Sequence, residues 1–583
     1  MIIPVEERID TLLTANSIHE GLETAATNVD ATAHFYLEDG PVSFTISELL
    51  STCGTGRALL ADRGVGKGDR VGILGSNDHH WARWAFSVWS AGAVAVPLPV
   101  PIRLRDADAI SEQVRSLATA SGCKAVAAHP MLAWTIPQEL LLPWEMPAIA
   151  DSAEPASGIT RDDIAVIQLT SGSTAFPKGA VLSHHAVLTG CWGGLTSYEA
   201  SDDMVVVGWL PFFHDMGLFA TLVSPFIAGL NVHLLPPERF ARAPGEWFRL
   251  ASRVGATMTI APPTAWAAAV RAVDRDPGGV EDLSLFTTAA LAAESIEPEV
   301  VERVLEVGGR FGLPREAVGG AYGLAETTLG VTVTYPGEGP AFDTIDLEIL
   351  AERGEAIPPR GGGPEKRLTS CGRTMPGVEM RVVGPDGSPL PERHAGEIHV
   401  QSPTLMEGYM DVPEADQPFT DDGWLRTGDI GYVADERLYV TGREKDLLIV
   451  LGRNYVPEDI EWAAARVEGV RAGRVVAFGR PGGGDADVIV AVEPTRQADP
   501  EKLPLLVRRM ISDSVGIRPR EVLVLAPGTI EKTTSGKLRR RALRDSYERG
   551  ALEPLATGPG GVDQRQFRQS FRGDRRGRLI AIL

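Results

Sequence analysis

Short apolar runs alternate with longer amphipathic stretches through the first half of the chain. Residues 71–74 form a continuous apolar run, residues 81–91 have the spacing of a helix, and residues 93–96 are apolar again. Apolar strands without polar alternation, joined by a helix, are typical of parallel βαβ units. The same rhythm returns at residues 166–169, 205–207, 232–235 and 257–261. The pattern therefore predicts an α/β body built on covered parallel sheets.

The hydrophobic pattern of the sequence changes after about residue 365, where the predicted strands become short and are interrupted by Gly, Pro and Asp. These strands indicate a small β-rich subdomain, and a charged-then-apolar junction follows them at 444–449. Beyond the junction, three strands and a helix at 503–515 predict a compact α+β domain of about 100 residues. The expected fold class is α/β, with a large N-terminal domain at residues 1–442, its β-rich subdomain at about 366–442, and a small C-terminal domain at 443–549.

The last segment, residues 550–583, differs in composition from the domains before it. It contains the Gly- and Pro-rich stretch PLATGPGG and then six arginines between positions 565 and 578. A solvated, flexible tail is the simplest interpretation, and a docking segment for a protein partner is the alternative.

Composition and charge exclude several classes of protein. The 583 residues carry 56 Lys and Arg against 77 Asp and Glu, a formal net charge of −21, and so acidic a chain repels nucleic-acid backbones. The four cysteines lie far apart, which argues against a zinc cluster and favours a reducing compartment. The N-terminus lacks the features of a signal peptide, and the apolar stretch at 86–100 is short and contains two prolines. We therefore predict a cytoplasmic protein that binds no nucleic acid and has no membrane span.

A loop rich in glycine and small hydroxyl residues follows the predicted strand at 166–169. Its sequence is TSGSTAFPKG, from Thr170 to Gly179. Small residues let backbone N–H groups approach an anion closely, hydroxyls add donors, and Lys178 adds a positive charge. The loop is not a Walker A motif, because no Gly-Lys-Ser/Thr ends it. Taken alone, the segment is compatible with a phosphate-binding loop or with a Ser/Thr-rich surface turn.

Five segments occur in a fixed order along the chain. They are TSGSTAFPKG at Thr170, AYGLAETTLG at Ala321, WLRTGDIGYV at Trp424, TGREKDLLIVLGRNYVPEDIE at Thr441 and EKTTSGKLRR at Glu531. In this order they resemble the adenylate-forming superfamily of acyl- and aryl-CoA ligases, peptide-synthetase adenylation domains and luciferases. One motif would be weak, but five in sequence are specific. The resemblance covers nearly all of residues 40 to 548.

Three features within that superfamily resemble the fatty acyl-AMP ligases. Residues 209–218, WLPFFHDMGL, look like their LPxxHDMGL segment, Ala325 stands before Glu326 where most relatives carry Thr, and residues 453–461 look like their GRNxxPxDIE signature. Residues 347–371 fall where this subfamily carries an insertion on the large domain, which is associated with the loss of CoA thioesterification. The resemblance implies that an acyl adenylate is passed to a carrier protein.

The implied reaction joins a carboxylate to MgATP, giving acyl-AMP and pyrophosphate, with Mg²⁺ as cofactor and catalysis by positioning and electrostatics. Glu326 is the implied magnesium ligand. Tyr322 is implied to stack on adenine, and Ala293 and Glu294 to line its opposite face, with Ala292 in place of the usual Gly. The residues implied to bind the β and γ phosphates are Thr170, Ser171, Gly172, Ser173, Thr174 and Lys178.

Four further residues receive roles from the resemblance. Asp429 is implied to accept hydrogen bonds from both ribose hydroxyls, and Arg443 to approach the ribose and phosphates from the domain junction. Lys537 matches the adenylation lysine, which a mobile small domain must deliver by closure. Lys445 lies where relatives swivel this domain and is the hinge candidate. Without the resemblance, Asp429 would be interpreted as a capping residue and Lys537 as part of a solvated basic run.

The acid-binding residues carry the least specific pattern. His214 resembles a residue at the mouth of the acyl pocket, where it could gate the carboxylate, and a structural His beside Asp215 is the alternative. The apolar residues near the expected wall could equally be plain core, so long-chain, branched and polycyclic acids all stay open. These residues are Trp209, Phe212, Met216, Gly217, Leu218, Pro262, Pro263 and Trp266.

The sequence thus predicts ATP-dependent activation of a hydrophobic carboxylic acid, with an acyl carrier protein as acceptor. An acyl-CoA ligase, which completes the thioester with CoA, is the first alternative. A catalytically inactive homologue that acts as a scaffold is the second, and the presence of every charged residue expected for the chemistry argues against it.

Overall fold

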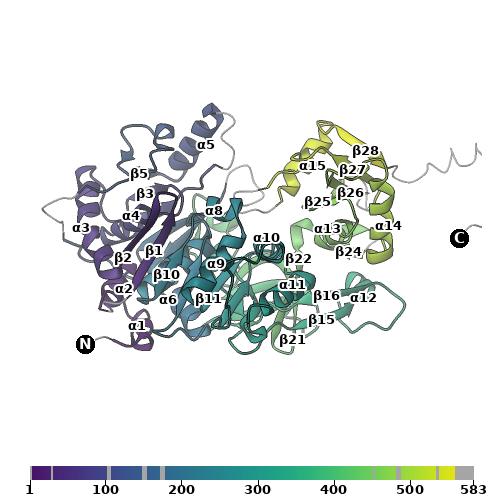
Figure 1. Ribbon diagram of the computed structural model, residues 1–583, viewed down its shortest axis with the longest axis horizontal. Coiled ribbons are helices and arrows are strands. Elements are labelled where there is room, and N and C mark those ends of the chain that lie inside the picture. Colours follow the sequence, from purple (N-terminus) through teal and green to yellow (C-terminus); the bar gives the residue numbers. More distant parts are fainter. Residues whose placement is uncertain are drawn as a thin grey trace, which may run out of the picture.

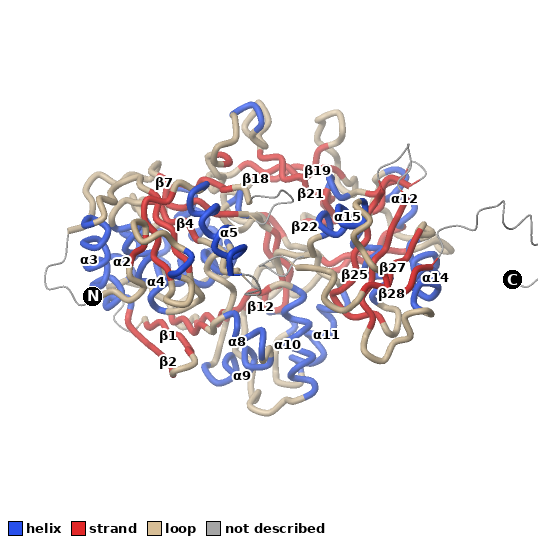
Figure 2. The backbone as a smooth tube through the Cα atoms, turned by 90° about the horizontal axis from the view of Figure 1, so that it is seen from above, coloured by secondary structure: helices blue, strands red, loops and turns tan. Residues whose placement is uncertain are grey.

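The computed structural model describes residues 3–27, 31–101, 107–147, 154–170, 177–450, 453–480, 487–532 and 538–558. These residues form a large body and, beside it, a small C-terminal domain (Figure 1). The same two parts are separate in the view from above (Figure 2). The expected α/β class is confirmed, with strands packed in mostly parallel sheets between helices.

The first sheet of the body has seven strands in the order β20-β8-β7-β4-β3-β5-β6. Strands β3 to β7 pair in parallel, and β8 and β20 add an antiparallel edge. Side chains alternate between its faces, so Val94 and Val96 pack in one apolar cluster and Ala93 and Ala95 in another. The strands are β3 (Arg70–Leu74), β4 (Val94–Pro97), β5 (Cys123–Ala128), β6 (Leu141–Leu142), β7 (Ile164–Leu169), β8 (Gly179–Ser183) and β20 (Gly408–Tyr409).

The second sheet has nine strands in the order β17-β14-β13-β12-β11-β9-β10-β1-β2, and its six central strands are parallel. The continuous apolar runs of the sequence become these buried strands because helices cover both faces. The strands are β1 (Thr32–Leu37), β2 (Gly40–Thr45), β9 (Val205–Gly208), β10 (Asn231–Leu234), β11 (Met258–Ala261), β12 (Thr288–Leu291), β13 (Val318–Tyr322), β14 (Thr332–Val333) and β17 (Arg373–Thr374).

One layer of helices lies between the two sheets and another on the outer face of each. The inner layer consists of α2 (Ile18–Ala25), α3 (Ile46–Asp62), α4 (His79–Ser90), α6 (His184–Ser197), the π-helix η2 (Met216–Val223) and α7 (Ser224–Ile227), with α1 (Val5–Thr11) at its edge. Helix α5 (Ala107–Ala120) covers the seven-stranded sheet. The nine-stranded sheet is covered by α8 (Pro237–Arg242), α9 (Gly245–Val254), α10 (Pro263–Arg275) and α11 (Pro298–Gly309).

A four-stranded antiparallel sheet and a hairpin complete the body. The sheet joins β18 (Glu379–Val383), β19 (Gly396–Gln401), β21 (Leu425–Ala434) and β22 (Arg437–Arg443). The hairpin of β15 (Phe342–Asp346) and β16 (Glu365–Thr369) carries helix α12 (Leu347–Arg353) between its strands. Most of the expected insertion therefore lies on this hairpin, next to the small domain (Figure 1).

The small domain has its own four-stranded sheet, in the order β25-β26-β27-β28, and its own apolar core. Strand β22 ends at Arg443, the turn η6 (Glu444–Asp446) follows, and Leu448 is the first residue after this turn that packs in the small-domain core. The elements are β23 (Leu448–Val450), β24 (Arg453–Tyr455), α13 (Pro457–Ala465), β25 (Val470–Arg480), β26 (Asp487–Pro494), α14 (Leu503–Val515), β27 (Glu521–Leu525), α15 (Arg540–Glu548) and β28 (Pro554–Gly558).

Strand β28 corrects the expectation that the chain becomes a flexible tail from residue 550. Residues 554–558 pair antiparallel with β27, and Ala556 is buried in the small-domain core. Proline is compatible with the first position of an edge strand, so PLATG contributes to the sheet despite its composition. The arginine-rich part of the predicted tail lies outside the described residues.

Among the described residues, no helix is both long enough and apolar enough to cross a membrane. Helix α3 is the longest helix in the described part of the chain, and its positions are a mixture of buried, half-buried and exposed.

Acidification is expected to destabilise the body through His184. This side chain is fully buried, and its Nδ1 accepts a hydrogen bond from the Ile18 N–H, 3.2 Å away at the start of α2. Burial lowers the pKa of His184 to about 4, so between pH 6.5 and 4 the unfolded chain binds a proton that the folded chain does not. The neutral His184 imidazole therefore contributes up to about 3 kcal/mol to the free energy of unfolding. This contribution is complete above pH 6.5 and is lost as the pH falls toward 4.

Urea titrations from pH 7.5 to 4.5 would measure this slope. His184→Asn should flatten it, whereas the control His394→Asn, which removes a half-exposed imidazole, should not. Equal slopes for wild type and His184→Asn would contradict the assignment. Burial also lowers the pKa of His19, His79 and His233, so part of the slope should remain in the variant.

Candidate active site

Four of the predicted segments follow the carboxyl ends of strands in the two parallel sheets. The phosphate loop follows β7, the segment with His214 follows β9, residues 292–294 follow β12, and Glu326 follows β13. In open parallel sheets these ends form the crevice where ligands bind. Two side chains tie the sheets together there: Gln168 Nε2 donates to the Phe213 carbonyl at 2.9 Å, and Asn77 Nδ2 donates to the Leu210 carbonyl at 2.7 Å.

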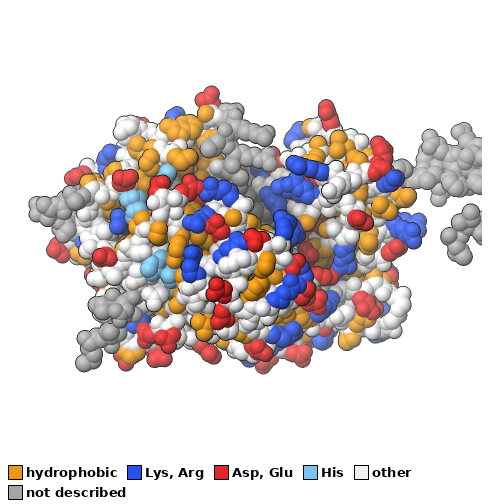
Figure 3. All heavy atoms as spheres, in the orientation of Figure 1, with side chains coloured by type: hydrophobic (Ala, Val, Ile, Leu, Met, Phe, Trp, Pro, Cys, Tyr) orange, Lys and Arg blue, Asp and Glu red, His pale blue; other side chains and the backbone are white. Residues whose placement is uncertain are grey.

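Lys and Arg side chains gather around the hollow between the body and the small domain on the face drawn in Figure 3. This local excess of positive charge contrasts with the acidic chain as a whole. It is the electrostatic setting that an anionic ligand such as a nucleotide requires.

The phosphate loop is described only at its two ends. Thr170 N–H donates to the Lys178 carbonyl at 2.8 Å, which closes the base of the loop. The Lys178 side chain is exposed, and its Nζ lies 4.4 Å from the ring centroid of Tyr409. Four of the predicted phosphate ligands lie outside the described residues, as does the predicted catalytic lysine: Ser171, Gly172, Ser173, Thr174 and Lys537.

Glu326 lies in a short turn directly after β13, with its carboxylate in contact with Tyr409. The Tyr409 hydroxyl donates to Glu326 Oε1, and the backbone N–H of Met406 donates to the Glu326 carbonyl at 2.9 Å. Burial raises the pKa of Glu326 and the nearby Asp215 charge raises it further, whereas the Tyr409 hydrogen bond and Arg443 lower it.

The oxygen chemistry of Glu326 is compatible with magnesium. Mg²⁺ is bound in proteins through one or two carboxylates together with substrate phosphates and water. A carboxylate has two acceptor oxygens, so Tyr409 occupies one and the other can face a cation. Asp215 is the second carboxylate near this position, and sequence reasoning assigned it no ligand role.

Asp429 links the predicted adenine and ribose residues. Its Oδ2 accepts a hydrogen bond from the Tyr322 hydroxyl at 2.8 Å, and its Oδ1 lies 2.9 Å from Arg443 Nε. Asp429 is 5% exposed, whereas the Arg443 side chain is 62% exposed, so the guanidinium can turn toward a ligand. Because a carboxylate offers about four lone-pair positions, these contacts leave Asp429 able to accept ribose hydroxyls as well.

The opposite adenine wall has an unusual backbone. Ala293 has a φ of +69°, which alanine adopts at a cost of about 1 kcal/mol. Ala292 is buried, and Glu294 Oε2 accepts a weak hydrogen bond from the Thr264 N–H at 3.3 Å. Residues held in such conformations concentrate at ligand sites.

His214 pairs with Asp215, as the structural alternative for this residue required. Their Nδ1 and Oδ1 atoms are 2.5 Å apart, and the two side chains are 21% and 17% exposed. Gly217, in the following π-helix, has no room for a side chain, because a Cβ would lie 2.0 Å from the Pro211 carbonyl oxygen. Asp215 lies close enough to Glu326 for its charge to raise the pKa of that carboxyl.

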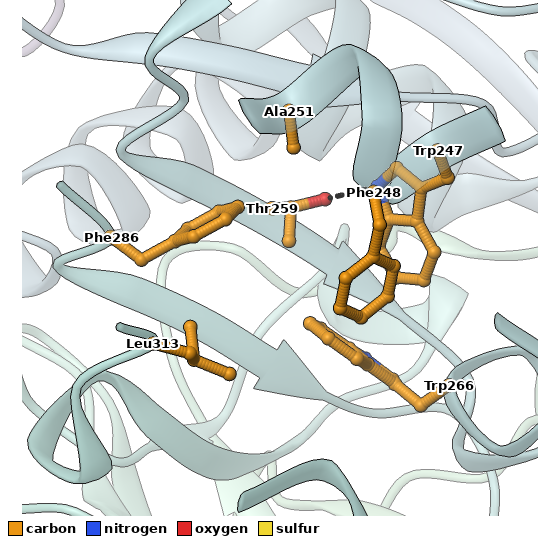
Figure 4. A pocket seen from close by; sticks show the side chains of 7 residues that line it. All are labelled: Trp247, Phe248, Ala251, Thr259, Trp266, Phe286 and Leu313. Atoms are coloured by element: carbon orange, nitrogen blue, oxygen red, sulfur yellow. Dashed lines mark hydrogen bonds between the residues drawn. The ribbon is translucent and has the colours of Figure 1, made fainter. Parts of the chain in front are cut away.

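The apolar candidates for the acyl pocket are all buried. Trp209 stacks on Phe240 with ring centroids 3.6 Å apart, and Met216 and Leu218 belong to the main core. Trp266 lines a small apolar cavity between the nine-stranded sheet and helices α9 and α10 (Figure 4). Its other lining residues are Trp247, Phe248, Ala251, Thr259, Phe286 and Leu313. The Thr259 hydroxyl is hydrogen-bonded to Trp247, so the lining is effectively apolar.

The hinge candidate Lys445 lies in η6, and its neighbour Asp446 contacts a residue that the sequence did not single out. Arg540 has Nη1 3.0 Å from Asp446, and its Nη2 is 2.8 Å from Glu458 and 3.1 Å from Glu461. Arg540 begins α15, three residues after Lys537. The only sequence signal for it was its place in a run of arginines, which is more often a solvated surface.

Comparison with known proteins adds to this geometry. The chain matches a family described as AMP-binding enzyme over residues 22–410. A Caulobacter vibrioides protein with the provisional name acyl-CoA synthetase is 32% identical over 517 residues, covering 85% of this chain and 88% of the relative. The long-chain-fatty-acid–AMP ligase FadD28 of Mycobacterium tuberculosis is 32% identical over 419 residues, covering 67% and 71%.

The fold of this chain is also similar to solved structures. A solved structure from a study of fatty acyl-adenylate ligases from E. coli and L. pneumophila superposes with a TM-score of 0.84 and 28% identity. The superposition covers 92% of this chain and 99% of the other, so it includes the body and the small domain.

Proposed function

Because this chain belongs to the family of AMP-binding enzymes, we propose that it is an ATP-dependent ligase that converts a hydrophobic carboxylic acid to its acyl adenylate and passes it to a carrier protein. One observation carries the proposal. Arg443 pairs with Asp429, the predicted ribose ligand, and also acts electrostatically on Glu326, the predicted metal ligand. The residues proposed to bind the ribose and the metal ion of MgATP therefore lie near the same arginine side chain.

The chemistry follows from these positions. A carboxylate oxygen of the acid attacks the α-phosphorus, the new O–P bond forms, and the bond to the β-phosphate breaks as pyrophosphate leaves. Asp429 and Tyr322 hold the nucleoside, and Lys178 holds the outer phosphates. Glu326 would hold Mg²⁺, which when bound neutralises phosphate charge. Arg443 and the incoming Lys537 would stabilise the charge that develops on the α-phosphate.

The insertion supports a carrier protein over CoA as acceptor. Leu347 and Ala351 of α12 are buried in the core of the small domain, whereas Ile345, Ala356 and Leu368 pack against the four-stranded sheet of the body. The insertion is therefore attached to both domains. A rotation of the small domain to a thioester-forming arrangement would expose these apolar side chains to water. The cytoplasmic location stays a prediction.

A pyrophosphate-release screen over fatty, aryl and terpenoid acids tests the proposal. We expect release with a long apolar acid, an acyl adenylate detectable by mass, and acyl transfer to a carrier protein with little acyl-CoA. Acyl-CoA formation as fast as adenylation would support the CoA ligase instead. Failure to exchange pyrophosphate with every acid in the panel would favour the inactive scaffold.

A further inference from the structure

Tyr409 lies at the edge of the seven-stranded sheet, beside the strand that leaves the phosphate loop. Strand β20 pairs with β8, and Met410 N–H donates to the Gly179 carbonyl at 2.8 Å. Gln417 fixes the same residue from the other side, because its Oε1 accepts from Tyr409 N–H at 2.7 Å and its Nε2 donates to the Tyr409 carbonyl at 2.9 Å. The backbone of Tyr409 is thus held on both sides.

The side chain of Tyr409 contacts two charged groups of opposite sign. Its hydroxyl donates to Glu326 Oε1, and its ring face lies 4.4 Å from Lys178 Nζ. An ammonium at this distance is attracted by the ring quadrupole. Lys178 makes no ion pair with a described carboxylate, so the aromatic ring is its charge-stabilising contact in the described part of the chain.

We propose that Tyr409 is a positioning residue that keeps the phosphate-binding Lys178 and the metal-binding Glu326 apart and correctly oriented. The inference rests on the proposed function, because the two charges matter only if the crevice binds MgATP. A direct Lys178–Glu326 ion pair would neutralise both groups before the nucleotide arrives. Tyr409 instead gives each of them a weaker, neutral contact that a phosphate or a cation can replace.

The two contacts make separable contributions. The hydroxyl donates to Oε1 of Glu326 and so orients the carboxylate, which leaves its other oxygen for a cation. The ring holds the lysine. Removing the hydroxyl should therefore affect the metal, and removing the ring should in addition release Lys178 to pair with Glu326.

Equilibrium binding tests both contributions without turnover. ATP affinity is measured by calorimetry with and without Mg²⁺, and Mn²⁺ binding in the presence of ATP by electron paramagnetic resonance. In Tyr409→Phe we expect Mn²⁺ binding and the metal-dependent gain in ATP affinity to fall about tenfold, with metal-free ATP affinity unchanged. In Tyr409→Leu we expect metal-free ATP affinity to fall as well.

Tyr432→Phe is the matched control, because Tyr432 also donates a hydrogen bond to a carboxylate, Asp343 at 2.8 Å, in the β-rich part of the body. It should change neither measurement. Unchanged Mn²⁺ binding in Tyr409→Phe, or an equal loss in the control, would overturn the inference. If wild type binds no ATP, the proposed function itself fails. If Tyr409→Leu does not fold, Tyr409→Phe alone decides.

Discussion

Replacing Lys537 by alanine is expected to lower the rate of acyl-AMP formation by two or more orders of magnitude and to change ATP affinity little. The ammonium group is proposed to bridge the attacking carboxylate and the α-phosphate as charge develops, so its contribution arises mainly in the transition state. An interaction of this kind lowers kcat and leaves ground-state binding nearly intact. Pyrophosphate release gives the rate, and calorimetry gives the affinity.

A neighbouring cation provides the control. Arg539 is half-exposed, and its guanidinium lies 3.0 Å from the Glu531 carboxylate. Both residues are next to the antiparallel backbone pairing of Lys532 with Leu538, between which Lys537 falls in the sequence. Arg539→Ala removes a positive charge two residues from Lys537 and should change the rate less than threefold. If Lys537→Ala kept the wild-type rate, or if both variants lost activity equally, the lysine would have no specific role.

The sheets could be predicted from sequence because their strands are continuous apolar runs. Such runs can be recognised without knowledge of the neighbouring strand. The helix predicted near residues 503–515 is also observed, at Leu503–Val515. Strand β28 could not be found in this way. Its sequence PLATG carries little apolar character, and only the open edge of β27 makes it a strand.

The site residues divide in a similar way. Glu326, Asp429 and Arg443 lie inside motifs whose order predicts their roles, and the structure brings the three side chains together. Tyr409 and Arg540 act through contacts with residues far away in the chain, and no local pattern indicates such contacts. Arg540 looked like part of a solvated basic run, yet its guanidinium is mostly buried among three carboxylates.

The PEDIE segment at 457–461 shows how one helix serves two interactions. Glu458 and Glu461 hold Arg540 at the start of α15, and Asp459 between them holds Lys366 of the insertion hairpin. Charged side chains in a first helical turn are commonly exposed caps. Here the acidic side chains of residues 457–461 connect the insertion hairpin, through Lys366, to the start of α15, through Arg540.

Breaking the Lys366–Asp459 pair is expected to cost about 3–5 kcal/mol of stability. The ammonium lies 2.7 Å from Asp459 Oδ1 and 2.8 Å from Oδ2, and both side chains are less than 8% exposed. Lys366→Met removes the cation and leaves a buried carboxylate without its partner. Burial already raises the pKa of Asp459 and Lys366 counteracts this, so the variant carboxyl should titrate higher still.

The pair joins the hairpin of the body to the first turn of α13. Because both side chains are buried, the expected loss of stability is larger than that of a surface ion pair. Arg453→Met is the matched control, because Arg453 also connects the small domain to the insertion, 3.6 Å from Glu352, but both side chains are more than a third exposed. Exposed pairs contribute about 0–1 kcal/mol. The double variant Lys366→Met/Asp459→Leu should recover much of the loss, since it leaves no unpaired charge.

Urea unfolding of the three variants and of wild type would measure these differences, and hydrogen exchange of α12 would locate them. Loss of the pair should raise exchange in α12, because Leu347 and Ala351 are held in the small-domain core by the same junction. Equal stability of Lys366→Met and Arg453→Met would show that the buried pair adds no more than a surface contact. The insertion would then be held to the small domain by its apolar side chains alone.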